Sequence, residues 1–206
     1  MFFILLSVMN SLRNFALALS LFSIVMVVSC TQSTDHTQDT AATAPLSDSA
    51  IIKRGEYLVG ILGCQDCHSP KKMGPQGPEV IAELHLSGYP ADRPIGKNVP
   101  DALKNGWMLF GGDGTSSIGP WGMSFAANLT SDPTGIGTWS YEQFKIALTQ
   151  GKSKGIATAR PLLPPMPWPN YINMADEDMK AVFAYLKSTK PVSNVVPAPI
   201  APDKLQ

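Results

Sequence analysis

The run Cys64-Gln65-Asp66-Cys67-His68 constrains this chain more than any other feature. Two cysteines separated by two residues and followed at once by histidine are typical of c-type haem attachment. Each thiol can add to one vinyl group of the haem, and the adjacent imidazole then becomes the proximal ligand of the iron. We therefore predict that Cys64 and Cys67 hold one haem c covalently, that His68 ligates its iron, and that the chain folds around this group.

Two other kinds of site use a Cys-x-x-Cys pair. A structural zinc ion takes four thiolate or imidazole ligands, usually from two such pairs, and the sequence contains no second pair. A thioredoxin-like redox pair starts a helix within a βαβ unit, and the residues around Cys64 show no such alternation. Neither alternative accounts for the histidine that follows directly.

The N-terminal 29 residues are typical of an export signal, because a basic residue precedes an apolar run over 15–28 and no acidic residue occurs before Asp35. The run ends in Ser29-Cys30, which resembles the lipobox of bacterial lipoproteins. We therefore predict that Cys30 is lipidated and becomes the mature N-terminus. The alternative is an uncleaved anchor, since residues 1–28 are long enough to span a bilayer. The predicted location is the periplasmic side of a bacterial membrane, either inner or outer.

Three helices are predicted. Residues 51–62 carry apolar side chains at helical spacing, and Gly55 within them indicates that another helix or ring approaches closely. Residues 140–148 begin with serine and glutamine at capping-box spacing and stop at Gly151. Residues 176–187 open with three acids and carry apolar residues at i, i+3, i+4 and i+7, so this last helix is the clearest of the three.

The stretch 69–133 is dense in glycine and proline and shows no sustained period. So long an irregular connection is unusual in a compact domain, but a large buried cofactor can order loops that lack regular structure. We therefore expect this stretch to form loops wrapped over the haem.

The second axial ligand decides between an electron carrier, a gas-binding protein and a catalyst. Met166 is the leading candidate because the four prolines of segment 162–169 fix φ and can hold a thioether on iron. His85 is an alternative that would give bis-histidine ligation, and Met123 is a second thioether on a rigid turn. His36 lies in a polar segment and is predicted to face solvent. A methionine ligand raises the reduction potential.

Three stretches of the chain share a pattern with one known family. The first is Gly55-Glu56-Tyr57-Leu58 with the motif Cys64 to His68, and the second is Asn128 to Pro133 with Gly135 to Trp139. The third is Leu163 to Trp168 with Asp176-Glu177-Asp178 and Ala184 to Lys187. Together they resemble class I cytochromes c, specifically bacterial periplasmic cytochromes related to the cytochrome subunits of membrane dehydrogenases. Ala175 departs from this family, which usually has a helix-capping threonine or serine there, and the departure should cost about 1 kcal/mol. The chain has one attachment motif, whereas the related dehydrogenase subunits carry several.

The resemblance implies an all-α fold in which the N- and C-terminal helices cross, with Gly55 under the ring of Phe183 or Tyr185. It also implies thioethers at both cysteines of the motif, His68 as proximal ligand and Met166 as distal ligand. Residues 1–29 would be a lipoprotein signal peptide, 30–50 a flexible tether, 51–197 the cytochrome c domain and 198–206 a C-terminal tail.

These observations predict a periplasmic monohaem cytochrome that carries single electrons between a respiratory donor and acceptor and catalyses no bond change. Its predicted partners are redox proteins, such as a dehydrogenase or oxidase of a respiratory chain, and the membrane through the N-terminal lipid. The 16 basic and 16 acidic residues balance, so no nucleic-acid partner is indicated. Two alternatives stay open: a gas-binding or peroxidatic haem protein with an open or labile distal site, and a fixed cytochrome subunit of a dehydrogenase complex.

Overall fold

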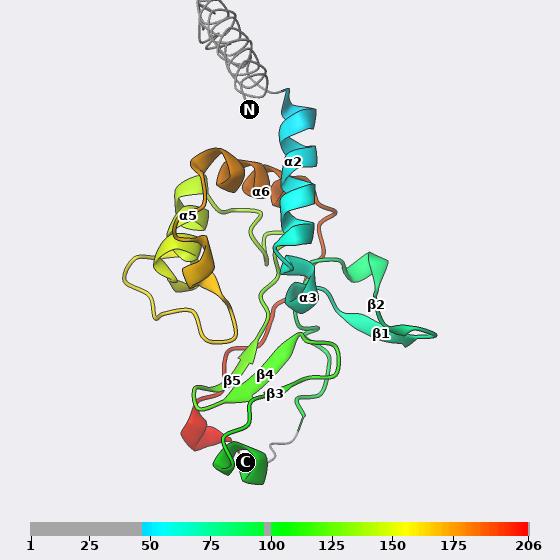
Figure 1. Ribbon diagram of the computed structural model, residues 1–206, viewed down its shortest axis with the longest axis vertical. Helices are drawn as coiled ribbons and strands as arrows, with labels where there is room; N and C mark the ends of the chain where they lie inside the picture. The colour runs from blue at the N-terminus through cyan, green and yellow to red at the C-terminus, as the bar shows by residue number, and fades with distance from the viewer. Residues whose placement is uncertain (1–46, 97–99, 206) are drawn as a thin grey trace, which may run out of the picture. The chain divides into compact units, whose positions relative to one another are not determined.

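The structure of the protein is a computed structural model that describes residues 47–96 and 100–205 (Figure 1). The predicted signal peptide, the lipidation site Cys30, His36 and most of the predicted tether lie outside these residues. Within them, no helix is both long enough and apolar enough to cross a membrane. The long helices are α2 (Asp48–Ile61), α5 (Tyr141–Gln150) and α6 (Asp176–Ser188).

All three predicted helices are present, and their ends follow from local chemistry. The Ser47 side chain caps α2 by accepting a hydrogen bond from the Ala50 amide at 3.4 Å. Ser140 and Gln143 form the predicted capping box at the start of α5, each side chain bonding the other residue's backbone amide. Gly151 ends that helix in the left-handed conformation at φ 61°, where a residue without Cβ is favoured.

Helices α2 and α6 pack against each other, and Gly55 lies where they meet. A Cβ atom at Gly55 would overlap the carbonyl oxygen of Ala181 and would lie 2.7 Å from Cβ of Tyr185. The close approach predicted for this glycine is therefore present, although its partners are the α6 backbone and the first side-chain atom of Tyr185. The main hydrophobic core forms at this contact and reaches α5, and its buried residues are Leu58, Val59, Leu86, Ile136, Phe144, Met179, Ala181, Val182 and Leu186.

The expectation of an all-α fold is wrong, because the region between α3 (Cys64–His68) and α5 contains two small antiparallel sheets (Figure 1). Strands β1 (Lys71–Gly74) and β2 (Gly77–Val80) form a hairpin. Strands β3 (Leu109–Phe110), β4 (Ser116–Gly119) and β5 (Gly122–Phe125) form a three-stranded sheet in the order β3-β4-β5. The protein is a mixed helix and strand structure. The remaining short elements are α4 (Pro100–Lys104) and the 3-10 turns η1 (Ala82–Leu84), η2 (Ser153–Gly155), η3 (Trp168–Tyr171) and η4 (Pro202–Lys204).

The strands were not predicted because each has only two to four residues and lies among glycines and prolines. Their turns explain that composition. Gly77 has φ 123° in the β1–β2 hairpin and Gly122 has φ 96° at the start of β5, both in the region that favours glycine. A period-2 pattern cannot be recognised over so few residues, so this composition predicts loops where the structure has strands.

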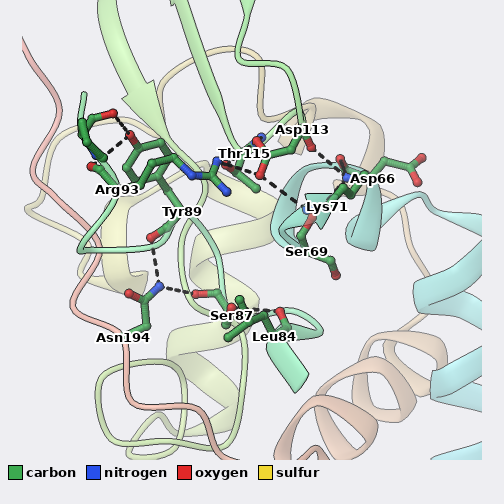
Figure 2. Close-up of polar contacts among 11 residues, drawn as sticks. Asp66, Ser69, Lys71, Leu84, Ser87, Tyr89, Arg93, Asp113, Thr115 and Asn194 are labelled. Carbon is green, nitrogen blue, oxygen red and sulfur yellow. Dashed lines mark hydrogen bonds and ion pairs between the residues drawn. The ribbon is translucent and has the colours of Figure 1, made fainter. Parts of the chain in front are cut away.

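Two asparagine side chains connect the segment after α6 to residues that precede α5. Asn194 donates to the carbonyl oxygens of Ser87 at 2.7 Å and Tyr89 at 2.9 Å (Figure 2). Asn128, which is 4% exposed, donates to the Val192 carbonyl at 2.8 Å. These two side-chain amides, of which Asn128 is buried and Asn194 half-buried, replace regular secondary structure as hydrogen-bond partners of the backbone in this part of the fold.

Candidate haem site

The motif residues lie on α3, a single helical turn that follows α2 after a break at Gly63. Gly63 adopts the left-handed conformation at φ 68°, which redirects the chain before Cys64. Residues three apart on a helix share a face, so the thiols of Cys64 and Cys67 lie on one side of the turn. Both are free thiols and both are half-buried. This arrangement can form two thioether bonds to one flat group.

His68 is held by its backbone and by its ring. Its carbonyl accepts a hydrogen bond from the Gly88 amide at 2.8 Å, and its Nδ1 lies 2.7 Å from the carbonyl oxygen of Ala127. A carbonyl can only accept, so Nδ1 must carry the proton and Nε2 must keep its lone pair. A metal-ligating histidine usually has its ring fixed in this way, with the second nitrogen bonded to a backbone carbonyl or carboxylate.

Burial controls the protonation of these groups. Loss of solvation raises the pKa of the Cys64 thiol to about 11. Burial also raises the pKa of Cys67, although the nearby ammonium of Lys71 opposes the change. The pKa of His68 is lowered by burial, against the effect of the Ala127 carbonyl. The imidazole is therefore neutral at pH 7, which is the form that binds iron.

Tyr171 lies near Cys64 and Cys67, although nothing in the sequence predicts this. It ends η3 and is 7% exposed. Burial raises the pKa of its phenol, and the nearby Cys64 and Cys67 raise that pKa further. Tyr171 follows Met166 by five residues, so the proline-rich segment leads to a residue whose phenol is within electrostatic range of the attachment motif. No local pattern marks this tyrosine, because its neighbours come from a distant part of the chain.

The segment that carries Met166 is held on both sides. Before it, the Pro164 carbonyl accepts a hydrogen bond from the Ser124 hydroxyl at 2.7 Å. After it, the indole of Trp168 packs directly on Gly151 at the end of α5. Met166 itself is half-buried. A thioether on this segment therefore starts from a restrained backbone, as the prolines predicted.

Met123, the alternative thioether, lies in β5 and is 7% exposed. It is paired in register with Ile118, and its amide and carbonyl both bond the backbone of Ile200 at 2.8 and 3.0 Å. Successive residues of a strand face opposite sides of the sheet, so Met123 faces away from the side on which Ser124 contacts Pro164. Met123 and the Met166 segment are therefore on opposite faces of this sheet.

His85, the alternative imidazole, has a hydroxyl close to each ring nitrogen. Its Nδ1 lies 3.4 Å from the Ser69 hydroxyl and its Nε2 lies 3.5 Å from the Tyr185 hydroxyl. Burial lowers the pKa of this imidazole, against the opposing charge of Glu56. His85 is therefore placed beside α2 and α6 with both nitrogens near protein partners.

No protein family model matches the chain. The gluconate 2-dehydrogenase cytochrome c subunit of Pantoea cypripedii is 34% identical over 68% of this chain and 23% of its own length. The alcohol dehydrogenase (quinone) cytochrome c subunit of Gluconobacter oxydans is 30% identical over 74% of this chain and 24% of its own length. The fructose dehydrogenase cytochrome subunit of Gluconobacter japonicus is 29% identical over 75% and 25%.

The chain is a homologue of cytochrome c subunits of membrane dehydrogenases. This homology confirms the predicted relationship and supports an electron-transfer role that depends on haem c. The chain spans about a quarter of the length of these curated relatives. The donor set of the site agrees with this relationship, because two thiols and a neutral imidazole with a free Nε2 lie on one helical turn.

Proposed function

We propose that this protein is a monohaem c-type cytochrome that carries single electrons between a respiratory donor and acceptor. Cys64 and Cys67 would form thioether bonds to one haem c, with His68 and Met166 as the axial ligands. When bound, haem supplies a one-electron iron couple. The proposal includes no substrate bond change, so the protein would not itself be an enzyme.

The hydrogen bond from His68 to the Ala127 carbonyl is the observation that carries this proposal. It fixes the tautomer in which Nε2 is the available ligand, and it holds the ring plane through a backbone group that does not change with redox state. An imidazole that keeps its position in both oxidation states lowers the reorganisation that accompanies electron transfer.

Two contacts favour Met166 over its rivals as distal ligand. The Ser124–Pro164 hydrogen bond and the packing of Trp168 on Gly151 restrain its segment on both sides. Met123 is engaged on the other face of the sheet, and each nitrogen of His85 is near a hydroxyl. Moving His85 onto iron would break these contacts, whereas the contacts that restrain the Met166 segment are made by Pro164 and Trp168 and do not use the Met166 side chain.

We also propose the finer placement of the protein: a signal peptide at 1–29, lipidation at Cys30, a tether at 30–50, the cytochrome domain at 51–197 and a tail at 198–206, on the periplasmic side of a membrane. Its partners would be redox proteins of a respiratory chain. The names of the relatives favour one second possibility, in which the chain is a fixed subunit of a dehydrogenase complex. Purification from membranes in mild detergent separates the two, because a fixed subunit copurifies in stoichiometric amount with a catalytic chain.

Absorption spectroscopy of the periplasmically matured full chain tests the ligand assignment. We expect a low-spin ferric spectrum with the far-red charge-transfer band of a sulfur-ligated haem. Met166→Leu, which preserves side-chain volume, should abolish that band, and the matched control Met123→Leu should retain it.

Other results would contradict the assignment in distinct ways. Loss of the band in Met123→Leu alone would make Met123 the ligand, and a low-spin spectrum without the band in the parent protein would indicate His85. A high-spin parent protein that binds carbon monoxide when reduced would favour a gas-binding or peroxidatic protein.

A further inference from the structure

Lys71, the first residue of β1, has its ammonium group surrounded by three backbone carbonyls (Figure 2). Its Nζ donates to the carbonyl oxygens of Asp66 at 2.6 Å, Ser69 at 3.1 Å and Asp113 at 2.9 Å. A lysine ammonium has three protons, so each proton has one acceptor. The charge is therefore held in one position, unlike that of an ordinary surface lysine.

Two of these carbonyls belong to the haem attachment segment. Asp66 lies within α3, and Ser69 is its C-terminal cap. In a longer helix the Asp66 carbonyl would accept from the amide four residues later, but that residue is Pro70, which has no N–H. The Lys71 ammonium takes the place of the missing donor, and it lies at the negative end of the α3 dipole.

The third carbonyl ties this segment to the turn between β3 and β4. The Asp113 carboxylate accepts from the Thr115 amide at 3.1 Å and forms an ion pair with Arg93 at 2.7 Å. Its side chain is only 8% exposed, so the turn is rigid where Lys71 contacts it. Gly114 packs against the same place, since a Cβ there would lie 2.8 Å from the Asp66 carbonyl oxygen.

The Lys71 charge is not cancelled by its neighbours. The buried carboxylate of Asp113 lies close to Lys71, with its Oδ2 3.5 Å from the Lys71 amide nitrogen, but Arg93 neutralises it in an ion pair. The Asp66 side chain is exposed to solvent, which screens its charge. Lys71 itself is half-buried, and its Nζ donates to the carbonyls of Asp66 and Ser69, the residues that flank Cys67 and His68. A fixed, partly desolvated cation therefore lies beside the point of haem attachment.

We propose that Lys71 is a positioning residue that holds the haem attachment segment against the β3–β4 turn and, through its fixed charge, raises the reduction potential of the haem. This rests on the proposed function. Reduction removes one positive charge from the iron site, so a nearby cation favours the reduced form. The effect persists at high salt, because partly buried charges are screened much less than exposed ones.

Redox titration of the matured, haem-loaded full chain tests this proposal. Lys71→Met removes the charge and should lower the midpoint potential, with the ratio of reduced to oxidised protein at fixed ambient potential falling at least threefold. That ratio corresponds to about 28 mV, since a tenfold change in a one-electron couple is 59 mV. The matched control is Lys72→Met, which removes the same charge from an exposed neighbour and should change the ratio by less than half as much.

Two further variants separate charge from structure. Lys71→Arg keeps the charge and should have a midpoint potential close to that of the parent protein. Lys71→Gln is neutral but still donates hydrogen bonds, so it should have the lower potential. It also provides the test if Lys71→Met does not fold. The proposal is overturned if Lys71→Gln keeps the parent potential, if Lys71→Arg falls as far as Lys71→Gln, or if Lys72→Met shifts the potential as much as the Lys71 variants. A parent protein without covalently bound haem would instead overturn the proposed function.

Discussion

Replacing Gly55 by alanine should test the contact between α2 and α6 directly. A Cβ at this position would overlap the Ala181 carbonyl oxygen and would lie 2.6 Å from its carbonyl carbon. Carbon atoms in contact normally lie about 3.5–4.0 Å apart, so the two helices must separate by about 1 Å. The obstructing atoms belong to the α6 backbone and cannot rotate away as a side chain could.

The expected cost follows from two opposing effects. Alanine in place of glycine favours a helix by about 0.5–1 kcal/mol. Overpacking a well-packed contact costs about 1–3 kcal/mol, and an immobile backbone neighbour places Gly55→Ala at the upper end of that range. We expect a net loss of about 2 kcal/mol in the free energy of unfolding, which lowers Tm by about 4–8 °C for a domain of this size.

Gly60 provides the matched control on the same helix. Apart from its chain neighbours and the backbone of its own helix, nothing lies within 4 Å of the position that its Cβ would occupy, so Gly60→Ala should gain the propensity effect alone and stabilise the protein by about 0.5–1 kcal/mol. Urea denaturation followed by far-ultraviolet circular dichroism measures both variants. The reasoning is refuted if Gly55→Ala is as stable as the parent protein, or if the two variants lose the same stability.

Helix α6 supports two further predictions. Its N-terminal cap, Ala175, makes no side-chain hydrogen bond, so Ala175→Ser should raise the free energy of unfolding by about 1 kcal/mol in urea denaturation, and an unchanged midpoint would contradict the capping argument. The pKa of Asp176 lies below its usual value of 3.8 because its carboxylate accepts hydrogen bonds from Lys145, Lys180 and Tyr141. A depressed folded-state pKa means that this contribution is fully present above the unfolded value and is lost as pH falls toward the folded one. Asp176→Asn should therefore be less stable than the parent protein at pH 7, and the difference should shrink in denaturation curves measured below pH 4; a constant difference would show that the charge is not responsible.

The helices could be predicted because their signals are local. Ser140, Gln143 and Gly151 define α5 through contacts within a few residues, and the acids of 176–178 mark the start of α6 in the same way. The strands of 71–125 could not be predicted, since two to four residues carry no readable period and depend on a partner strand for their hydrogen bonds.

The residues of the candidate site also fall into those that the sequence predicts and those that depend on distant contacts. The spacing of Cys64, Cys67 and His68 is a covalent property of the chain, and their haem-binding roles stay predictions that the homology supports. No residue pattern marks Tyr171 or the position of the Lys71 charge. Tyr171 is 107 positions from Cys64 along the chain. Two of the carbonyls that hold Lys71 are local, but the third, that of Asp113, is 42 positions away.

The sequence by itself determined the attachment motif, the three long helices and the close approach at Gly55, because each depends on residue type at short spacing. Only the tertiary structure decided which His68 nitrogen keeps its lone pair, which face of the sheet Met123 occupies, and where the Lys71 charge is held. Those features depend on the carbonyls of Ala127 and Asp113 and on the pairing of β4 with β5. Hydrogen bonds between distant backbone groups form only once the chain has folded, so no local pattern of residues could have revealed them.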